Sequence, residues 1–159
     1  MGGSTQRSRA EDVAAVTELL GREPRAGFEV VVRNDQGMPV VIRNHPLLDD
    51  GTPMPTRFYL VDRELNRRIG TIEAEGGVRR SEAEVGLEAI ARTHDLYRVE
   101  RDAHIPADWN GPRPVGGVGG TRQGVKCLHA HYAHHLAGGD DPVGRWVQHQ
   151  LDLGGADRD

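Results

Sequence analysis

Several residue types that define common protein classes are scarce in this chain of 159 residues. The single cysteine excludes an internal disulfide, and no run of about 18 apolar residues is present that could span a membrane. Aromatic residues make up only 4%, so the core must consist mostly of Val, Leu, Ile and Ala. Lysine and arginine are scattered among a slight excess of acidic residues, without the basic stripe that follows a phosphate backbone. We therefore expect a cytoplasmic protein with no nucleic-acid and no membrane partner.

The length of the chain fits one domain and is short for two. The first residues, "MGGSTQRSRAED", lack the apolar core of a secretory signal, and Gln6 stands where a myristoylation pattern requires Ser or Thr. We predict a disordered lead over residues 1–9, a single globular domain over 10–153 and a disordered tail over 154–159.

Three short stretches predict strands. In "FEVVVRNDQGMPVVIRN", two β-branched runs at 28–33 and 40–43 flank Asn-Asp-Gln-Gly, whose residues tolerate turn conformations, which indicates a β-hairpin. The prolines of "GTPMPTRFYLVD" hold their predecessors extended, which favours a third strand at 57–61. A small antiparallel sheet of about three strands is therefore expected.

Apolar residues at helical spacing, together with residues that begin or end helices, predict about five helices. Ser81 and Glu84 have the spacing of a capping box at the start of the longest one, and Asp141 with Pro142 is typical of a helix start. The predicted helices lie in the segments 10–21, 62–75, 81–102, 122–137 and from 142 onward. Together with the sheet, they predict an α+β fold.

The stretch "KCLHAHYAHH", residues 126–135, holds the only cysteine and four of the eight histidines. On a helix, Cys127, His131 and His134 would stand at i, i+4 and i+7 on one face. Because thiolate and imidazole are the usual zinc donors, these three are candidate ligands of a transition metal such as zinc. Alternatively, Cys127 packs as a small apolar residue and the outer histidines are solvated. His129 would point to the opposite side, where a hydrogen-bonded core histidine is favoured.

Glycines run into the predicted helix start in "GGVGGTRQGVK". A helix start attracts anions, so Arg122 and Lys126 are candidate contacts for a phosphate group. The alternative is a flexible glycine-rich loop.

A polar stripe marks the predicted helix 81–102, where His94, Tyr97 and Arg101 share one face. We expect this helix to pack along the helix that follows Cys127, so that the stripe reaches Cys127, His129 or His134. If both polar stripes face solvent instead, no common site forms.

Several of these segments together resemble an actinobacterial domain-of-unknown-function family, number 501. The segments that carry the resemblance are "GTPMPTRFYL", "THDLYRVERD", "VKCLH", "AH" at 133–134 and "DPVG". The family has no established activity, so the resemblance implies positions and no reaction: Thr56, Tyr59, His94, Tyr97, Arg101, Lys126, Cys127, His129 and His134. One branch of that family carries Cys-x-Cys where this chain has Asn34, Asp35 and Gln36. That difference weakens the prediction of zinc. His131 and His135 lie outside the motif of the family, so the resemblance favours Cys127, His129 and His134 over these outer histidines.

Two functional hypotheses follow. In the first, the chain is a small enzyme or binding protein for an anionic, phosphorylated small molecule; Arg101 and Lys126 neutralise charge, and Cys127 or a histidine is nucleophile, base or metal ligand. Its candidate catalytic residues are His94, Tyr97, Arg101, Cys127, His129 and His134. In the second, the protein is non-catalytic, and these side chains form a buried structural network or support an interaction role.

Overall fold

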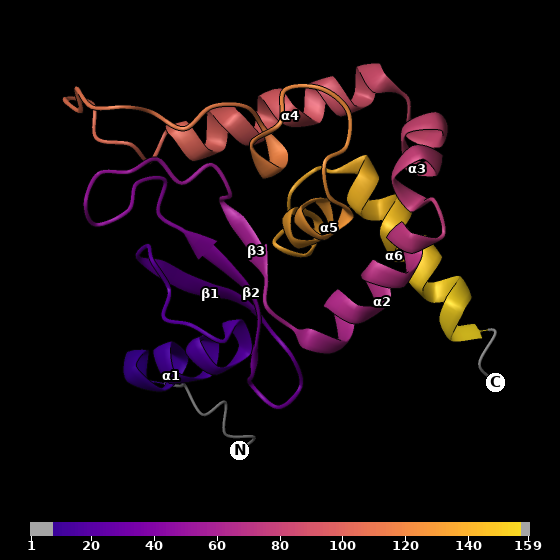
Figure 1. The fold of residues 1–159 in the computed structure, drawn as a ribbon, viewed down its shortest axis with the longest axis horizontal. Helices are drawn as coiled ribbons and strands as arrows, with labels where there is room; N and C mark the ends of the chain where they lie inside the picture. The colour runs from indigo at the N-terminus through magenta and orange to yellow at the C-terminus, as the bar shows by residue number, and fades with distance from the viewer. Residues whose placement is uncertain (1–7, 157–159) are drawn as a thin grey trace.

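The computed structural model describes residues 8–156, which form an α+β fold, as predicted (Figure 1). The described residues hold three strands and six α-helices. The strands are β1 (Phe28–Arg33), β2 (Pro39–Asn44) and β3 (Phe58–Leu60). The helices are α1 (Arg9–Leu20), α2 (Arg63–Ala74), α3 (Gly77–Val85), α4 (Leu87–Asp102), α5 (Leu128–Leu136) and α6 (Pro142–Ala156).

The sheet is antiparallel with the order β1-β2-β3, which confirms the predicted hairpin and third strand. At the hairpin tip, the side-chain oxygen of Asn34 accepts hydrogen bonds from the backbone N–H groups of Gln36 and Met38, and Gly37 takes a φ of 78°. A side chain that mimics a turn and a glycine with positive φ are the features that made this stretch readable as a turn.

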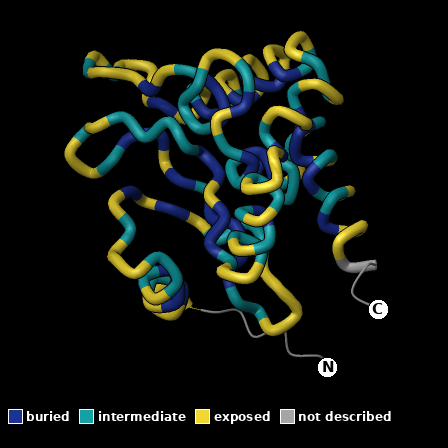
Figure 2. The backbone as a smooth tube through the Cα atoms, turned by 45° about the vertical axis from the view of Figure 1, so that its right-hand side comes forward, coloured by how far each residue is buried: buried dark blue, intermediate teal, exposed yellow. Residues whose placement is uncertain are grey.

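The two faces of the sheet are covered by different helices. Ile42 packs with Val16 of α1 on one face, whereas its neighbour Val41 belongs to the larger core built from α2, α4, α5 and α6 on the other face. This follows from the alternation of side chains along a strand. Figure 1 shows α1 beside the sheet on one side and α5 between β3 and α6 on the other. Figure 2 shows the buried segments in the interior, between exposed turns.

The predicted helix 81–102 is wrong as a single element, because the chain breaks at Gly86 between α3 and α4. Gly86 has a φ of 92°, which L side chains rarely adopt, so glycine allows the chain to turn there. Ser81 does not cap a helix; it is buried inside α3, and its hydroxyl donates to the Val78 carbonyl. The break lets α3 pack against α6 while α4 crosses the molecule in another direction (Figure 1).

The predicted helix 122–137 begins six residues later, at Leu128. Before it, Gly124 has a φ of 61° and Cys127 is extended, with φ −152° and ψ 126°. Carboxylates from two other helices hold this segment: Glu82 of α3 accepts the Val125 N–H at 2.9 Å, and Glu73 of α2 accepts the Leu128 N–H at 2.9 Å. Distant partners therefore replace the helical hydrogen bonds that local sequence predicts.

The two ends of the described chain differ in part from the predicted boundaries. Ser8 and Arg9 fall in the predicted lead, yet both are ordered parts of the fold. Ser8 caps α1, and the Arg9 guanidinium lies 4.3 Å from the centre of the Phe28 ring. Helix α6 continues to Ala156, past the predicted domain end at 153. Residues 1–7 of the predicted lead and 157–159 of the predicted tail lie outside the described residues. Across residues 8–156, no helix combines the length and the apolar character that crossing a membrane requires.

Candidate functional site

A buried cluster lies where α5 meets the start of α6. The Nδ1 atoms of His131 and His134 lie 2.8 and 3.0 Å from the same carboxylate oxygen of Asp141. The other oxygen of Asp141 accepts the N–H groups of Val143 and Gly144, so Asp141 caps α6 as predicted. Burial alone would raise the pKa of Asp141, but the hydrogen bonds from the two histidines outweigh it and hold this pKa well below its usual range. The Nδ1 atoms of both histidines are therefore occupied by Asp141, whereas the buried Nε2 of His131 has no hydrogen-bond partner among the described residues.

His94 of α4 holds the glycine-rich loop. Its Nε2 lies 2.8 Å from the Gly124 carbonyl oxygen, and its Nδ1 accepts the N–H of Val118 at 3.1 Å. Because a carbonyl only accepts, the Nε2 atom carries the proton. Burial lowers the pKa of His94, which favours the neutral ring that this pair of contacts requires. His94 thus positions the loop that precedes α5.

Tyr97 of α4 reaches His134 of α5, as expected, although these two helices do not pack along each other in the described structure. Its ring centre lies 5.0 Å from that of His134, edge to face. Its buried hydroxyl oxygen accepts the backbone N–H groups of Arg57 and Phe58, and burial raises the pKa of Tyr97 to about 12. Tyr97 therefore secures the start of β3.

Arg101 is fully buried and bound within the protein. Its Nε donates to Asp102 at 2.9 Å and one terminal nitrogen donates to the Pro55 carbonyl at 3.1 Å. It does not line the pocket at Cys127, described below. The expected role of Arg101 in neutralising the charge of a ligand in that pocket has no geometric support.

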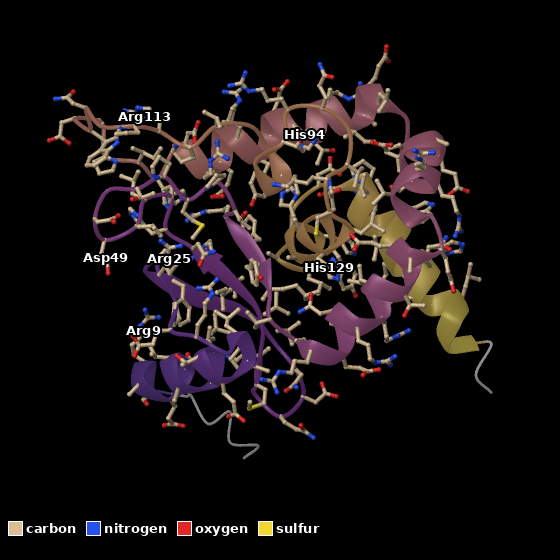
Figure 3. The ribbon with its side chains drawn as sticks, in the orientation of Figure 1. Arg9, Arg25, Asp49, His94, Arg113 and His129 are labelled. Atoms are coloured by element: carbon tan, nitrogen blue, oxygen red, sulfur yellow. The ribbon has the colours of Figure 1, made fainter. Side chains whose placement is uncertain are left out.

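The second cluster on α5 consists of Cys127, His129 and Glu73. The Cys127 sulfur lies 3.4 Å from His129 Nδ1, and this nitrogen lies 3.5 Å from Oε1 of Glu73. His129 Nε2 lies 3.0 Å from the carbonyl oxygen of Asn66 and must donate to it, so Nδ1 is the ring nitrogen that faces the sulfur. Figure 3 shows His129 on the side of α5 toward α2, whereas His94 comes from α4, across α5 from His129. One helix thus carries two separate polar clusters.

The charges of Cys127 and His129 depend on each other. Burial opposes ionisation of the thiol, but the hydrogen bond with His129 and the nearby backbone N–H of Ala130 outweigh it and lower the pKa of Cys127. The hydrogen bond with Cys127 raises the pKa of His129 to about 9, against the opposing effect of burial. The arrangement favours a thiolate beside an imidazolium, the form in which a cysteine is nucleophilic.

A pocket of about 390 Å³ opens at this pair, a size suited to a small molecule. Its cation is Lys126, an exposed side chain whose Nζ lies 3.3 Å from the Gly119 carbonyl oxygen. Phe58 lines the pocket and also stacks on His134, with ring centres 5.6 Å apart, so one wall rests on the buried cluster. The lining residues are Thr56, Phe58, Tyr59, Leu60, Asn66, Gly119, Lys126, Cys127, His129 and Ala130.

The candidate anion contacts Arg122 and Lys126 are not brought together. Arg122 lines a different pocket, with His94 and Arg98, whereas Lys126 lines the pocket at Cys127. Moreover, the N–H of Leu128 at the start of α5 already binds a carboxylate of the protein itself. A phosphate held jointly by the helix start, Arg122 and Lys126 therefore does not fit the described geometry.

The candidate metal ligands Cys127, His131 and His134 are also not assembled. Cys127 precedes the helix in extended conformation, and both histidines are bound to Asp141. Within residues 8–156, the group of three donors that could hold a metal ion is Glu73, Cys127 and His129. Sequence reasoning missed Glu73, because nothing in the predicted helix 62–75 distinguishes it from the other acidic residues there.

Comparisons with known proteins place the chain by family alone. Neither the curated proteins nor the solved structures searched gave a match. A family model described as "Protein of unknown function (DUF501)" matches residues 30–149, a segment that contains both clusters of α5. The match covers most of the sequence, and the chain belongs to this family.

Proposed function

We propose that this protein is a small enzyme that uses Cys127 as a nucleophile on a small anionic molecule, with His129 as its acid–base partner. The observation that carries the proposal is the 3.4 Å approach of the Cys127 sulfur to His129 Nδ1 at the wall of a pocket. A nucleophile within hydrogen-bond reach of a base that a third group orients is the arrangement that covalent catalysis requires. Here the Asn66 carbonyl oxygen is the orienting group.

The chemistry uses both members of the pair. The thiolate donates its electron pair to an electrophilic carbon and forms a sulfur–carbon bond, while the bond from that carbon to a leaving atom breaks. His129 gives its Nδ1 proton to the leaving atom and becomes neutral. Water can then attack the same carbon while the neutral ring takes a proton from it, and the sulfur–carbon bond breaks; the thiolate that leaves and the imidazolium restore the starting pair. Glu73, 3.5 Å from His129 Nδ1, favours the imidazolium before and after the cycle.

The pocket favours a small molecule with an anionic group. Lys126 is the cation among its lining residues, and its ammonium group is exposed. Phe58, Leu60 and Ala130 give the remaining walls an apolar character. A carboxylate or phosphate bound by Lys126 would leave the rest of the molecule against these walls and near the sulfur.

A labelling experiment tests both parts of the proposal. Cys127 is the only cysteine, so the intact mass reports its alkylation without ambiguity. Neutral iodoacetamide and anionic iodoacetate are compared, each relative to the same chain unfolded in urea. We expect Cys127 to react faster in the folded chain with both reagents, with a larger acceleration for iodoacetate. Incubation with small anionic esters, thioesters and acyl phosphates should then give a covalent mass increase at Cys127.

Matched variants assign the effects. Lys126→Met should slow iodoacetate several-fold and leave iodoacetamide nearly unchanged, whereas Arg122→Met removes the same charge at a different pocket and should change neither. His129→Gln should slow both reagents. A folded wild-type chain that reacts no faster than the unfolded one would refute the proposal.

The alternative hypothesis, a buried structural network, is supported for four of the candidate residues: His94, Tyr97, Arg101 and His134. Arg101 and the pair Tyr97–His134 are buried and bound within the protein, and His94 holds a loop. The double variant His94→Ala with His134→Ala should then lose a large part of its unfolding free energy, measured in urea. An unchanged or higher stability would favour a site for these residues instead.

A further inference from the structure

We propose that Glu73, Cys127 and His129 form a binding site for one soft divalent transition-metal ion, with zinc as the ion that the donors fit best. This proposal depends only on the three donors and does not rest on the proposed function. A thiolate, an imidazole and a carboxylate are all ordinary zinc ligands, and the thiolate discriminates against magnesium and calcium.

The spacing of the donor atoms fits a tetrahedral ion. Sulfur and nitrogen ligands at their usual zinc distances lie roughly 3.3–3.6 Å apart around a tetrahedral centre. The Cys127 sulfur lies 3.4 Å from His129 Nδ1, which lies 3.5 Å from Glu73 Oε1. All three donor atoms lie within 4.8 Å of one another. The two printed distances match those around a tetrahedral ion, and the sulfur and the Glu73 oxygen would need to approach each other only as far as binding requires from a separation below 4.8 Å.

Two of the three donors, His129 and Glu73, are already oriented by a contact with the backbone. His129 donates its Nε2–H to the Asn66 carbonyl, which turns Nδ1 toward the other two donors; a bound ion would displace the Nδ1 proton of the metal-free imidazolium. Glu73 uses Oε2 to accept the Leu128 N–H and keeps Oε1 on the side of His129. Backbone contacts of this kind typically support metal ligands, because they fix the tautomer and the orientation of the side chain.

The fourth position of the ion would face the pocket. Cys127 and His129 line that pocket, whereas Glu73 is not among its lining residues, so Glu73 would bind from behind. A site with three protein ligands and one open position is the arrangement of catalytic zinc, and the open position would take water or a pocket ligand. Metal-bound sulfur would no longer be free for alkylation, so the metal-bound and metal-free chains would differ in thiol reactivity.

Cobalt(II) is the probe, because it replaces zinc and absorbs light. The full chain is reduced, stripped of metal with a chelator and titrated with cobalt. We expect one cobalt per chain, with a near-ultraviolet thiolate-to-cobalt band and the visible bands of a tetrahedral ion, all abolished by an equivalent of zinc. Cys127→Ser should lose the thiolate band, and His129→Gln and Glu73→Gln should each weaken binding by about tenfold or more.

Glu82→Gln is the matched control for Glu73→Gln. Both carboxylates accept a backbone N–H of the same segment at 2.9 Å, but only Glu73 belongs to the donor group. Glu82→Gln should therefore bind cobalt as the wild type does. Equal affinity of wild type and Cys127→Ser for cobalt, or equal weakening by Glu82→Gln and Glu73→Gln in folded chains, would overturn the proposal. Alkylation of the metal-free chain tests the proposed function separately, so the two can fail independently.

Discussion

The two polar clusters of α5 contain similar groups in opposite surroundings. One combines His131 and His134 with Asp141 in the interior, where the Asp141 side chain has no exposed surface. The other combines His129 with Cys127 and Glu73, and about a quarter of the His129 and Glu73 side chains is exposed. The buried histidines use their Nδ1 atoms to connect α5 to the start of α6, whereas His129 holds its Nδ1 toward a sulfur at a pocket. Histidines of one helix thus connect two helices on one side and lie beside a thiol at a pocket on the other.

The largest effect is expected at Asp141. Asp141→Asn keeps a good helix cap but removes the charge that both histidines contact, and breaking a buried pair in this way costs about 3–5 kcal/mol of unfolding free energy. Asp140→Asn is the control, because Asp140 is exposed and its pair with Arg145 lies at the surface; it should cost less than about 1 kcal/mol. Urea unfolding of the two variants measures the difference. Equal losses would show that the buried cluster has no special role.

The carboxylate of Asp141 should also make the free energy of unfolding depend on pH in the acidic range. The pKa of Asp141 is lower in the folded chain than in an unfolded one, so its contribution is complete above the unfolded value of about 3.9 and is lost as the pH falls below it. The melting temperatures of wild type and Asp141→Asn should therefore stay separated by a constant interval near neutral pH and converge below about pH 4. An interval that does not narrow in acid would contradict this assignment.

A smaller loss is expected at Gly144, where α6 crosses α5. A Cβ atom there would lie 2.6 Å from the His131 carbonyl oxygen and 2.4 Å from the His135 Cβ atom, neither of which is the end of a flexible side chain. Gly144→Ala should therefore cost about 1–3 kcal/mol through overpacking. Gly154→Ala, in the same helix with nothing within 4 Å of the added atom, should be neutral or slightly stabilising. Comparing the melting temperatures of the two variants tests whether α6 lies this close to α5 at Gly144.

Much of the fold was readable from local sequence. The hairpin, the third strand, α2 and the start of α6 depend on side chains within a few residues, such as Asn34 in its own turn and Asp141 at its own cap. The break at Gly86 was missed because a glycine inside a helical pattern is often tolerated. The start of α5 was missed because Glu73 and Glu82, which hold the segment before it, lie 55 and 43 residues away along the chain.

The candidate site was readable only in part, for the same reason. Cys127 and His129 attract attention as residue types in a short stretch, but helical spacing paired Cys127 with His131 and His134. That pairing assumed that the helix had already begun at Cys127. Once Cys127 is extended, its partner is His129, two residues away, and the third member is Glu73 from a distant helix. The residue type could be predicted, whereas the partner depended on where the helix starts.

The smallest effect on stability, and the sharpest contrast with Asp141, is expected at Cys127. Cys127 occupies the cap position of α5, and in the described structure its sulfur lies near the Ala130 N–H without completing a capping hydrogen bond. Serine is a preferred residue at this position and accepts such bonds readily, so Cys127→Ser should leave the unfolding free energy unchanged or raise it by about 0.5–1 kcal/mol. The same substitution removes the sulfur and should abolish alkylation and the thiolate–cobalt band. Cys127→Ala, which removes the sulfur without adding a cap, should show the same chemical losses without the gain in stability. Urea unfolding and intact-mass labelling of the two variants give both readouts. A reactive group held at a pocket often lowers the stability of a protein, so its removal should not destabilise the fold. A loss of several kcal/mol of unfolding free energy in Cys127→Ser would instead show that Cys127 is a structural residue, like those of the buried cluster.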